Sequence, residues 1–229
     1  MFNWQKLLPL NAQRKRLLKR FSKSALNYYL SKSIPSLSQK VSETEFLVLD
    51  FETSGLDVKN DHILSVGYTV IKNNRAVMKS NQYAVIRQQT ELKTENVSIH
   101  QLTDAVIESG EEMKPVFDRL INDMSGRVLV AHNAAIEKKF INAACKKLYG
   151  CELPLRVIDT MQIEKVRKQR RHQTIKHNEL RLFNLRRVYG LPRYKAHNAL
   201  EDAIATAELL LVQITSICGN NRCRIKDIS

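Results

Sequence analysis

The sequence contains few of the residues that mark several protein classes. Cysteine occurs four times in 229 residues, and no two cysteines are spaced as CxxC. That excludes a disulfide scaffold and a zinc finger, so we expect four reduced thiols. Seven glycines and five prolines exclude collagen-like and low-complexity chains. No apolar run approaches the roughly 18 residues of a membrane-spanning helix, and 43% apolar residues are enough for a buried core.

Acidic residues are scarce in two long stretches of the chain. Residues 1–42 contain nine Lys and Arg residues and no acid, and residues 165–195 contain eleven with Glu179 as the single acid. The formal net charge is +14, so two basic blocks flank a mildly acidic body. Basic blocks attract polyanions, of which nucleic acid is the commonest. They also occur as merely solvated faces, and this alternative stays open.

The first 42 residues are predicted to form a segment outside the main domain. Leu17, Phe21 and Tyr28 recur at near-helical spacing between basic residues, which predicts a basic amphipathic helix. Residues 31–42 are rich in Ser and contain Pro35, as is typical of a linker. We therefore expect an arm with linker over 1–42, a main domain over 43–217 and a tail over 218–229. The arm could pack on the domain, contact nucleic acid or bind a protein.

From Glu43 onward, strand and helix patterns alternate. Short apolar runs predict strands over 46–50, 62–71, 75–86, 127–131 and 156–158. Asn73 and Asn74 separate the second and third runs and predict a hairpin. Helical periodicity is present over 111–124, 134–149, 180–189 and 199–217. These patterns predict an α/β fold, in which a mixed five-stranded sheet carries helices on its faces.

Asp50 and Glu52 follow the first predicted strand. Side chains at i and i+2 of an extended chain point to the same side, so both carboxylates share one face. Two like charges this close are costly unless a cation lies between them, and Mg²⁺ or Mn²⁺ prefers oxygen ligands. The pair therefore suggests a metal site, although a solvated strand end with two incidental acids has the same pattern.

Two further polar segments lie at element ends. Asp202 falls in the first turn of the last predicted helix, where it could face the sheet, and His197 precedes that helix. Asn133 is placed to cap the helix over 134–149, and Glu137 follows in its first turn. Ordinary caps and first-turn acids also explain each segment taken alone. Together they would bring four carboxylates and one histidine to one end of a mixed sheet.

These segments also match known motifs in order and spacing. The sequence resembles the DEDDh 3′–5′ exonuclease family, whose members include the proofreading epsilon subunit of bacterial DNA polymerase III and RNase T. The resemblance covers roughly residues 46–217 and rests on residues 50–56, 97–103, 131–140, 189–192 and 197–203. Two positions depart from the family pattern. Glu137 stands where the family usually has Asp, and Gln101 stands where Gly is common.

The resemblance implies a fold, a reaction and roles for residues. The fold would be ribonuclease H-like, and the reaction would release nucleoside 5′-monophosphates from the 3′ end of nucleic acid, with DNA as the favoured substrate. Two divalent cations, Mg²⁺ or Mn²⁺, would be held by Asp50, Glu52, Glu137 and Asp202, and His197 would be the general base. Residues implied at the terminal nucleotide are Phe51, Thr53, Gly55, Leu56, His100, His132 and Asn133.

Several alternatives remain at this point. The same fold could trim RNA, or the chain could bind nucleic acid through a weakened site. The partner would be a single-stranded 3′ end. Residues 5–10 faintly resemble a sliding-clamp-binding peptide, so the arm could also contact a clamp or polymerase. The resemblance implies a bacterial cytoplasmic location, whereas the acid-free N-terminus leaves organelle targeting as a minor alternative.

Overall fold

A mixed sheet lies at the centre of the protein in the computed structural model, which describes residues 8–21, 26–88, 103–194, 197–219 and 223–229. Its five described strands are β1 (Phe46–Thr53), β2 (Ile63–Lys72), β3 (Arg75–Val85), β4 (Val128–Ala131) and β5 (Val157–Asp159). They are ordered β3-β2-β1-β4-β5. Strand β1 is antiparallel to β2 and parallel to β4, and β4 is parallel to β5. The predicted α/β fold is confirmed.

The hairpin of β2 and β3 follows directly from the sequence. Asn73 and Asn74 connect the strands with φ angles of 52° and 56°. Asn tolerates this left-handed region better than most residues, and a two-residue turn of this kind matches the twist of its strands. The predicted hairpin is therefore confirmed.

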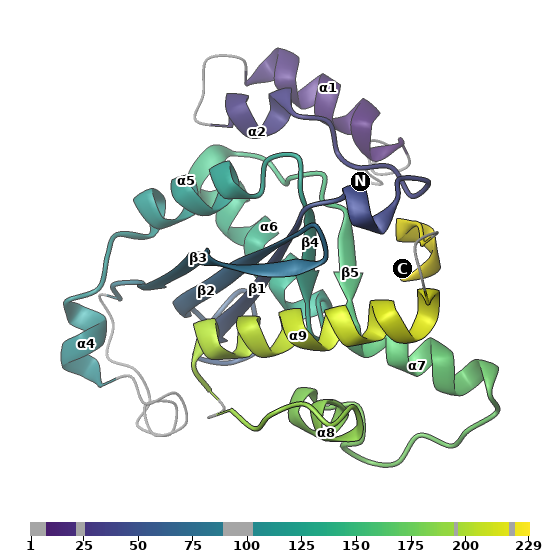
Figure 1. Cartoon of the computed structure of the whole chain (residues 1–229). Helices are drawn as coiled ribbons and strands as arrows, with labels where there is room; N and C mark the ends of the chain where they lie inside the picture. The colour runs from purple at the N-terminus through teal and green to yellow at the C-terminus, as the bar shows by residue number, and fades with distance from the viewer. Residues whose placement is uncertain (1–7, 22–25, 89–102, 195–196, 220–222) are drawn as a thin grey trace.

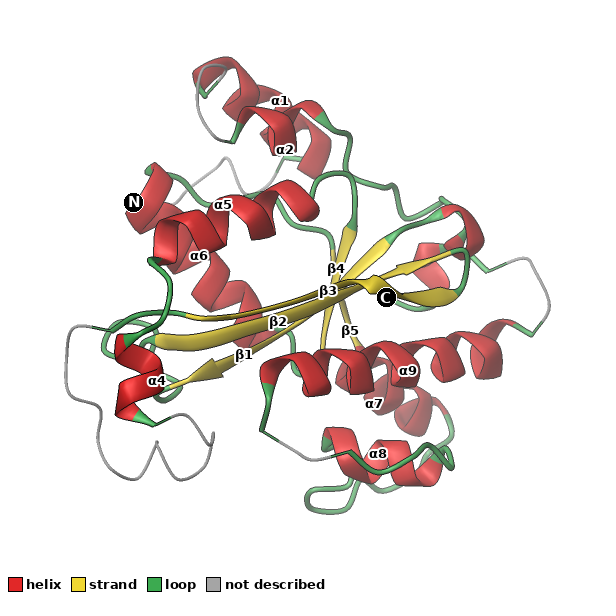
Figure 2. Cartoon of the chain, turned by 60° about the vertical axis from the view of Figure 1, so that its left-hand side comes forward, coloured by secondary structure: helices red, strands yellow, loops and turns green. Residues whose placement is uncertain are grey.

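Helices cover both faces of this sheet (Figures 1 and 2). One side carries α5 (Met113–Asp123) and α6 (Ala135–Tyr149), and the opposite side carries α7 (Thr160–Arg170), α8 (Leu182–Val188) and α9 (Ala199–Cys218). Helix α4 (Asp104–Glu108) lies beyond the end of β3. The sequence patterns predicted α5, α6, α8 and α9 to within two residues at each end, but they did not predict α4 or α7.

The side chains of strand β1 alternate between two hydrophobic clusters, one on each face of the sheet. Leu47, Leu49 and Phe51 pack with residues of α5 and α6. Phe46 and Val48 face the other way and pack with residues of α9. Because side chains alternate along a strand, Asp50 and Glu52 continue the face that carries Phe46 and Val48. The metal-binding prediction therefore depends on what α9 places at this end of the sheet.

The N-terminal segment packs on the body of the protein. It contains two described helices, α1 (Leu10–Arg20) and α2 (Asn27–Ser31), where one amphipathic helix was expected. Leu26 and Leu30 are fully buried in the cluster that also contains β1 side chains. The Tyr29 hydroxyl donates to the Pro154 carbonyl at 2.9 Å. Helix α2 is therefore part of the core.

The C-terminal residues pair with the predicted linker. The backbone of Ile225 donates to Gln39, and Val41 donates to Cys223. Short 3-10 turns, η2 (Val41–Glu43) and η3 (Ile225–Asp227), lie on the two sides of this contact. Ile225 is fully buried with Val41 in the cluster under α9. The tail thus closes one end of the core.

The cysteines differ from the expectation of four reduced thiols. Cys218 and Cys223 form a disulfide, whereas Cys145 and Cys151 are free and buried. The expectation is therefore wrong for the first pair, whose members the fold brings together at the end of α9. Within the described residues, no helix combines the length and apolar character needed to cross a membrane.

Candidate active site

Three carboxylates meet where the ends of β1 and α9 approach each other. Asp50 and Glu52 come from β1 and Asp202 comes from the first turn of α9. One oxygen from each lies within 4.8 Å of the others. The alternation of β1 supplies the first two acids, and the packing of α9 on the same face supplies the third. This cluster is the one that the sequence predicted could form.

A glycine in β2 allows α9 to come this close. Gly67 pairs with Asp50 in the antiparallel register. A Cβ atom on Gly67 would lie 2.1 Å from the Leu200 nitrogen and 2.2 Å from the Ala199 carbonyl carbon. Both contacts are to backbone atoms, which cannot move aside as a flexible side chain could. Gly67 therefore sets the distance between the sheet and the start of α9, and with it the position of Asp202.

We expect Gly67→Ala to damage both stability and activity. The added methyl group has to push the start of α9 away from β2, and overpacking of this kind costs about 1–3 kcal/mol or more. Asp202 would move with the helix, so the activity that the family resemblance implies should fall together with the melting temperature. Thermal unfolding and an assay of that activity on the variant would check this. Unchanged values of both would show that the contact with α9 is easily relaxed.

The three carboxylates of the cluster are partly or fully buried. Burial, and then the charges of Glu137, Asp202 and Glu52, raise the pKa of Asp50 well above its usual range. Burial also raises the pKa of Asp202 to about 7. The Oδ1 atom of Asp202 and the Oε2 atom of Glu137 are buried and have no hydrogen-bond partner among the described residues. Clustered buried carboxylate oxygens of this kind fit hard divalent cations.

Glu137 lies near this cluster on the other side of the sheet's end. It belongs to the first turn of α6 and is only 5% exposed. Burial raises its pKa to about 8, with a smaller contribution from Asp159. Its charge in turn acts on Asp50. In the described residues Glu137 is not one of the three whose oxygens lie within 4.8 Å, so its carboxylate borders the cluster.

Asp159 orients the start of α6, although its residue pattern did not mark it as a site residue. Its carboxylate accepts hydrogen bonds from the backbone nitrogens of Asn133 and Ala134 at 3.0 and 3.1 Å. It also caps α7 by accepting from Met161 at 2.9 Å. One residue thus fixes the turn that leads to Glu137. The sequence pattern that could have identified Asp159 is an acid between a strand and a helix. Because α7 was not predicted, this pattern was not recognised.

The turn before α6 differs from the prediction. Asn133 was expected to cap α6, but the N-cap is Ala134 and Asn133 adopts a φ of 63°. His132 is half-buried, with Nδ1 bonded to the Thr160 hydroxyl at 2.8 Å and Nε2 to the Leu180 carbonyl at 2.9 Å. Both ring nitrogens are therefore engaged within the protein, and His132 links three segments. Its contact with substrate stays a prediction.

His197 stands beside the carboxylates at the surface. It is exposed and adopts a φ of 70° immediately before α9. Its backbone nitrogen donates to the Oδ2 atom of Asp202 at 3.3 Å. Asn198 caps α9 by accepting from Leu200 and Glu201. The cap and this hydrogen bond place the backbone of the exposed His197 next to one of the cluster acids.

The remaining predicted substrate residues have diverse surroundings. Phe51 is buried and stacks near Phe117, with ring centroids 6.4 Å apart. The Thr53 hydroxyl donates to the Gly55 carbonyl, which tightens the loop after β1. The side chain of Leu56 is 72% exposed, as a contact for a ligand requires. His100 and Gln101 lie outside the described residues.

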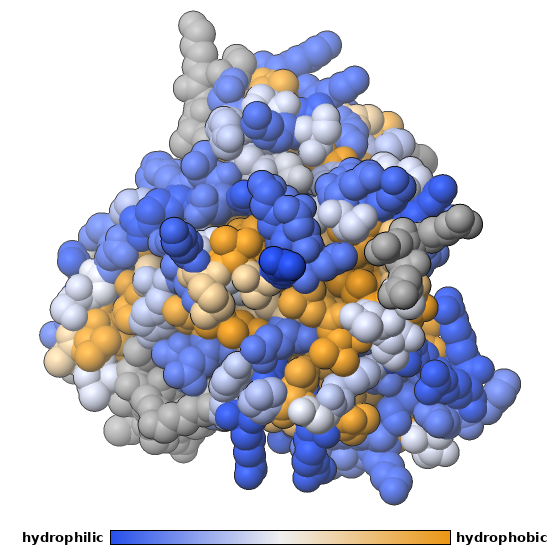
Figure 3. All heavy atoms as spheres, viewed as in Figure 1, coloured by the Kyte–Doolittle hydropathy of each residue, from blue (hydrophilic) through white to orange (hydrophobic). Residues whose placement is uncertain are grey.

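The second basic block is only partly available to a polyanion. Three of its cations form ion pairs within the protein: Arg167 with Glu164, Lys168 with Glu179, and Arg186 with Glu208. Others are exposed, namely Lys165, Arg170, Arg171, Lys176, Arg181, Arg187 and Arg193. Figure 3 shows hydrophilic side chains projecting at the lower edge, where α7 and α8 lie in Figure 1. The exposed subset leaves a basic surface beside α8.

Comparison with known proteins agrees with this arrangement. The chain is 28% identical over 166 residues to a PolC-type DNA polymerase III of Thermotoga petrophila, covering 72% of this chain and 12% of that protein. It is 26% identical over 168 residues to the 3′-5′ exonuclease DinG of Staphylococcus haemolyticus, covering 73% and 18%. The chain therefore spans less than a fifth of the length of these relatives.

Solved structures share the fold. Exonuclease I from E. coli, in complex with a dT13 oligonucleotide, superposes with a TM-score of 0.65 at 15% identity, covering 75% of this chain and 41% of that one. Exonuclease X, in complex with 5′ overhanging duplex DNA, superposes with a TM-score of 0.60 at 21% identity, covering 80% and 98%. A family model described as exonuclease, RNase_T, matches residues 47–210, which contain every acid of the site and His197. The chain therefore belongs to the RNase_T exonuclease family.

Proposed function

We propose that this protein is a metal-dependent 3′–5′ exonuclease that removes nucleoside 5′-monophosphates from the 3′ end of DNA. The observation that carries the proposal is the convergence of Asp50, Glu52 and Asp202 beside the exposed His197. DNA as the substrate is supported by a relative named a DNA polymerase III and by fold neighbours solved with DNA. The four acids favour a working enzyme over a module that only binds nucleic acid.

The carboxylates are suited to hold two divalent cations, and we infer that these are Mg²⁺ or Mn²⁺. Asp50, Glu52 and Asp202 would provide the principal ligands, and Glu137 would bind directly or through water. Such cations supply an activated water and neutralise charge on the leaving oxygen.

His197 is the proposed general base. A neutral imidazole nitrogen can accept the proton from the attacking water. The water oxygen bonds to phosphorus as the bond to the 3′-oxygen breaks, and the leaving oxygen is then protonated. The exposed position of His197 leaves room for a strand end, and its backbone hydrogen bond to Asp202 keeps it beside the metal ligands.

Two further parts of the proposal concern partners and location. Exposed cations around α8 would hold upstream phosphates without reading bases, so affinity should fall with salt. Similarity to PolC-type polymerases supports a polymerase context, with the N-terminal arm as a contact. Of the clamp-like peptide, residues 5–7 lie outside the described part of the chain. A cytoplasmic location is proposed as well.

End-labelled oligonucleotides test the function. We expect 3′-labelled DNA to release labelled mononucleotide at once with Mn²⁺ or Mg²⁺, 5′-labelled DNA to shorten progressively, and EDTA to stop both. RNA should be digested more slowly. His197→Ala should reduce the rate by about 100-fold or more, the typical contribution of general-base catalysis. Internal cleavage, digestion in EDTA, or full activity of the His197 variant would contradict the proposal.

A further inference from the structure

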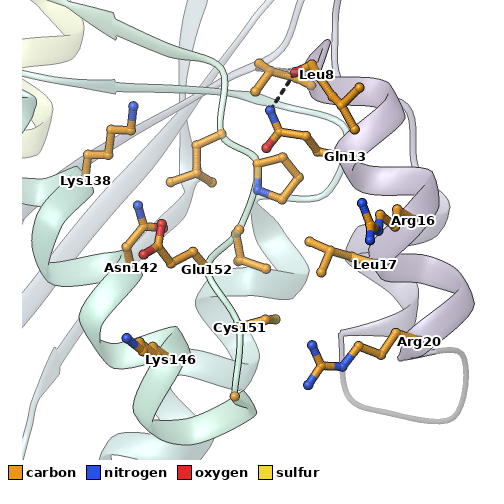
Figure 4. Close-up of a pocket in the computed structure, with 15 residues that line it drawn as sticks. Leu8, Gln13, Arg16, Leu17, Arg20, Lys138, Asn142, Lys146, Cys151 and Glu152 are labelled. Atoms are coloured by element: carbon orange, nitrogen blue, oxygen red, sulfur yellow. Dashed lines mark hydrogen bonds between the residues drawn. The ribbon is translucent and has the colours of Figure 1, made fainter. Parts of the chain in front are cut away.

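A groove lies between α1 and α6, away from the carboxylate cluster. Its volume is about 480 Å³, and its lining comes from α1, from α6 and from residues 150–155. Figure 4 shows Arg16, Leu17 and Arg20 on α1 at one side and Lys138 and Lys146 on α6 at the other. The family match begins at residue 47, so helix α1 and this wall of the groove lie outside it. The groove therefore combines the N-terminal arm with the enzyme domain.

The rim of the groove is positively charged. Arg16, Arg20, Lys138 and Lys146 line it, and Glu152 is the acid among its described lining residues. In the described part of the chain, none of these four cations forms an ion pair. Two opposed walls with available cations suit a ligand that carries several negative charges.

The floor of the groove is lined in part by apolar side chains, namely Leu17, Leu153, Pro154 and Leu155. Leu17 packs against the hydrophobic cluster that contains Leu153 and Leu155. Apolar pockets gain free energy from burying apolar side chains, at about 25 cal/mol per Å². None of the described lining residues is aromatic, so the groove lacks the surfaces on which bases of a single strand stack. A phosphodiester strand would use the rim but not this floor.

We infer that the groove is a docking site for an acidic, apolar peptide segment of a partner protein. Leu or similar side chains of the peptide enter between Leu17 and Leu155, and its Asp or Glu residues lie against the cations of α1 and α6. Peptide recognition in a hydrophobic groove of this kind is a common mode of protein association. The partner is held by the arm and the enzyme domain together.

Charge reversal at two rim positions tests this inference. Arg16→Glu with Lys146→Glu changes one cation on each wall. Lys15→Glu with Lys147→Glu makes the same charge change one residue away on the same helices, at exposed positions that do not line the groove. The full chain and both double variants are titrated in EDTA against three fluorescein-labelled probes: a peptide alternating Glu and Leu, a peptide alternating Glu and Ser, and an oligothymidylate.

We expect the Glu-Leu peptide to bind at least about tenfold more tightly than the Glu-Ser peptide. The rim variant should lose about tenfold in affinity for it, while the control variant changes less than about twofold. Nuclease activity and melting temperature should be unchanged in both. Equal binding of the two peptides, equal loss in the two variants, or no measurable binding would overturn the inference. Selective loss of oligothymidylate binding in the rim variant would assign the groove to nucleic acid instead.

Discussion

Asp202→Asn is expected to lower the rate of 3′-end digestion by about a thousandfold or more. Asp202 brings the third carboxylate to within 4.8 Å of Asp50 and Glu52, and it does so from a different element. Asn keeps the shape but removes the negative charge that would hold a cation. Loss of a bound cation removes several kcal/mol of transition-state stabilisation, and each 1.36 kcal/mol is a factor of ten in rate. Single-turnover release of a labelled mononucleotide with Mn²⁺ measures the effect.

A neighbouring acid provides the matched control. Glu201 lies in the same first turn of α9 but is exposed, so Glu201→Gln should leave the rate within about twofold. Asp50→Asn should match Asp202→Asn, because its carboxylate belongs to the same cluster. All three variants should bind an oligonucleotide and melt cooperatively. If Asp202→Asn and Glu201→Gln had the same small effect, the cluster would not be the catalytic centre.

Local periodicity made the sheet and the first two acids predictable. The alternation of β1 places Asp50 and Glu52 on one face, and Asn73-Asn74 marks a hairpin without reference to other parts of the chain. Asp202 was predictable as a first-turn acid of an apolar helix. That Asp202 lies close to the acids of β1 was only a hypothesis at that point. The packing of α9 on the sheet explains why these side chains meet.

Features that depend on distant contacts were not predictable. In the sequence, Gly67 has the pattern of an ordinary strand residue. The need for glycine follows only from the close approach of α9. Arg186 reads as part of a basic block, yet it is 1% exposed and donates to the carbonyls of Ala205 and Pro192 and to Glu208. Asp159 acts through backbone groups of a turn 25 residues away. In each case at least one partner is distant in sequence, so neither composition nor spacing could identify it.

Glu137→Gln is expected to make the metal-free protein more stable at high pH. A carboxyl whose pKa is raised binds more protons in the folded than in the unfolded state, so its ionisation destabilises the fold as pH rises. For Glu137 this cost grows from about its ordinary pKa of 4.5 toward the folded value of about 8. Gln cannot ionise and avoids that cost.

Thermal unfolding in EDTA measures this effect as a difference between two proteins. At pH 5 the melting temperatures of Glu137→Gln and the unaltered chain should nearly agree, because Glu137 is then protonated in the folded state. At pH 8.5 the variant should melt higher by at least about 2–4 °C, the shift expected per kcal/mol in a domain of this size. Mn²⁺ at pH 8.5 should stabilise the unaltered chain and reduce the difference, since a cation favours ionised Glu137. If the variant melted higher by the same amount at both pH values, Glu137 would lower stability through its packing and not through its ionisation. A difference that Mn²⁺ left unchanged would show that Glu137 does not face the metal.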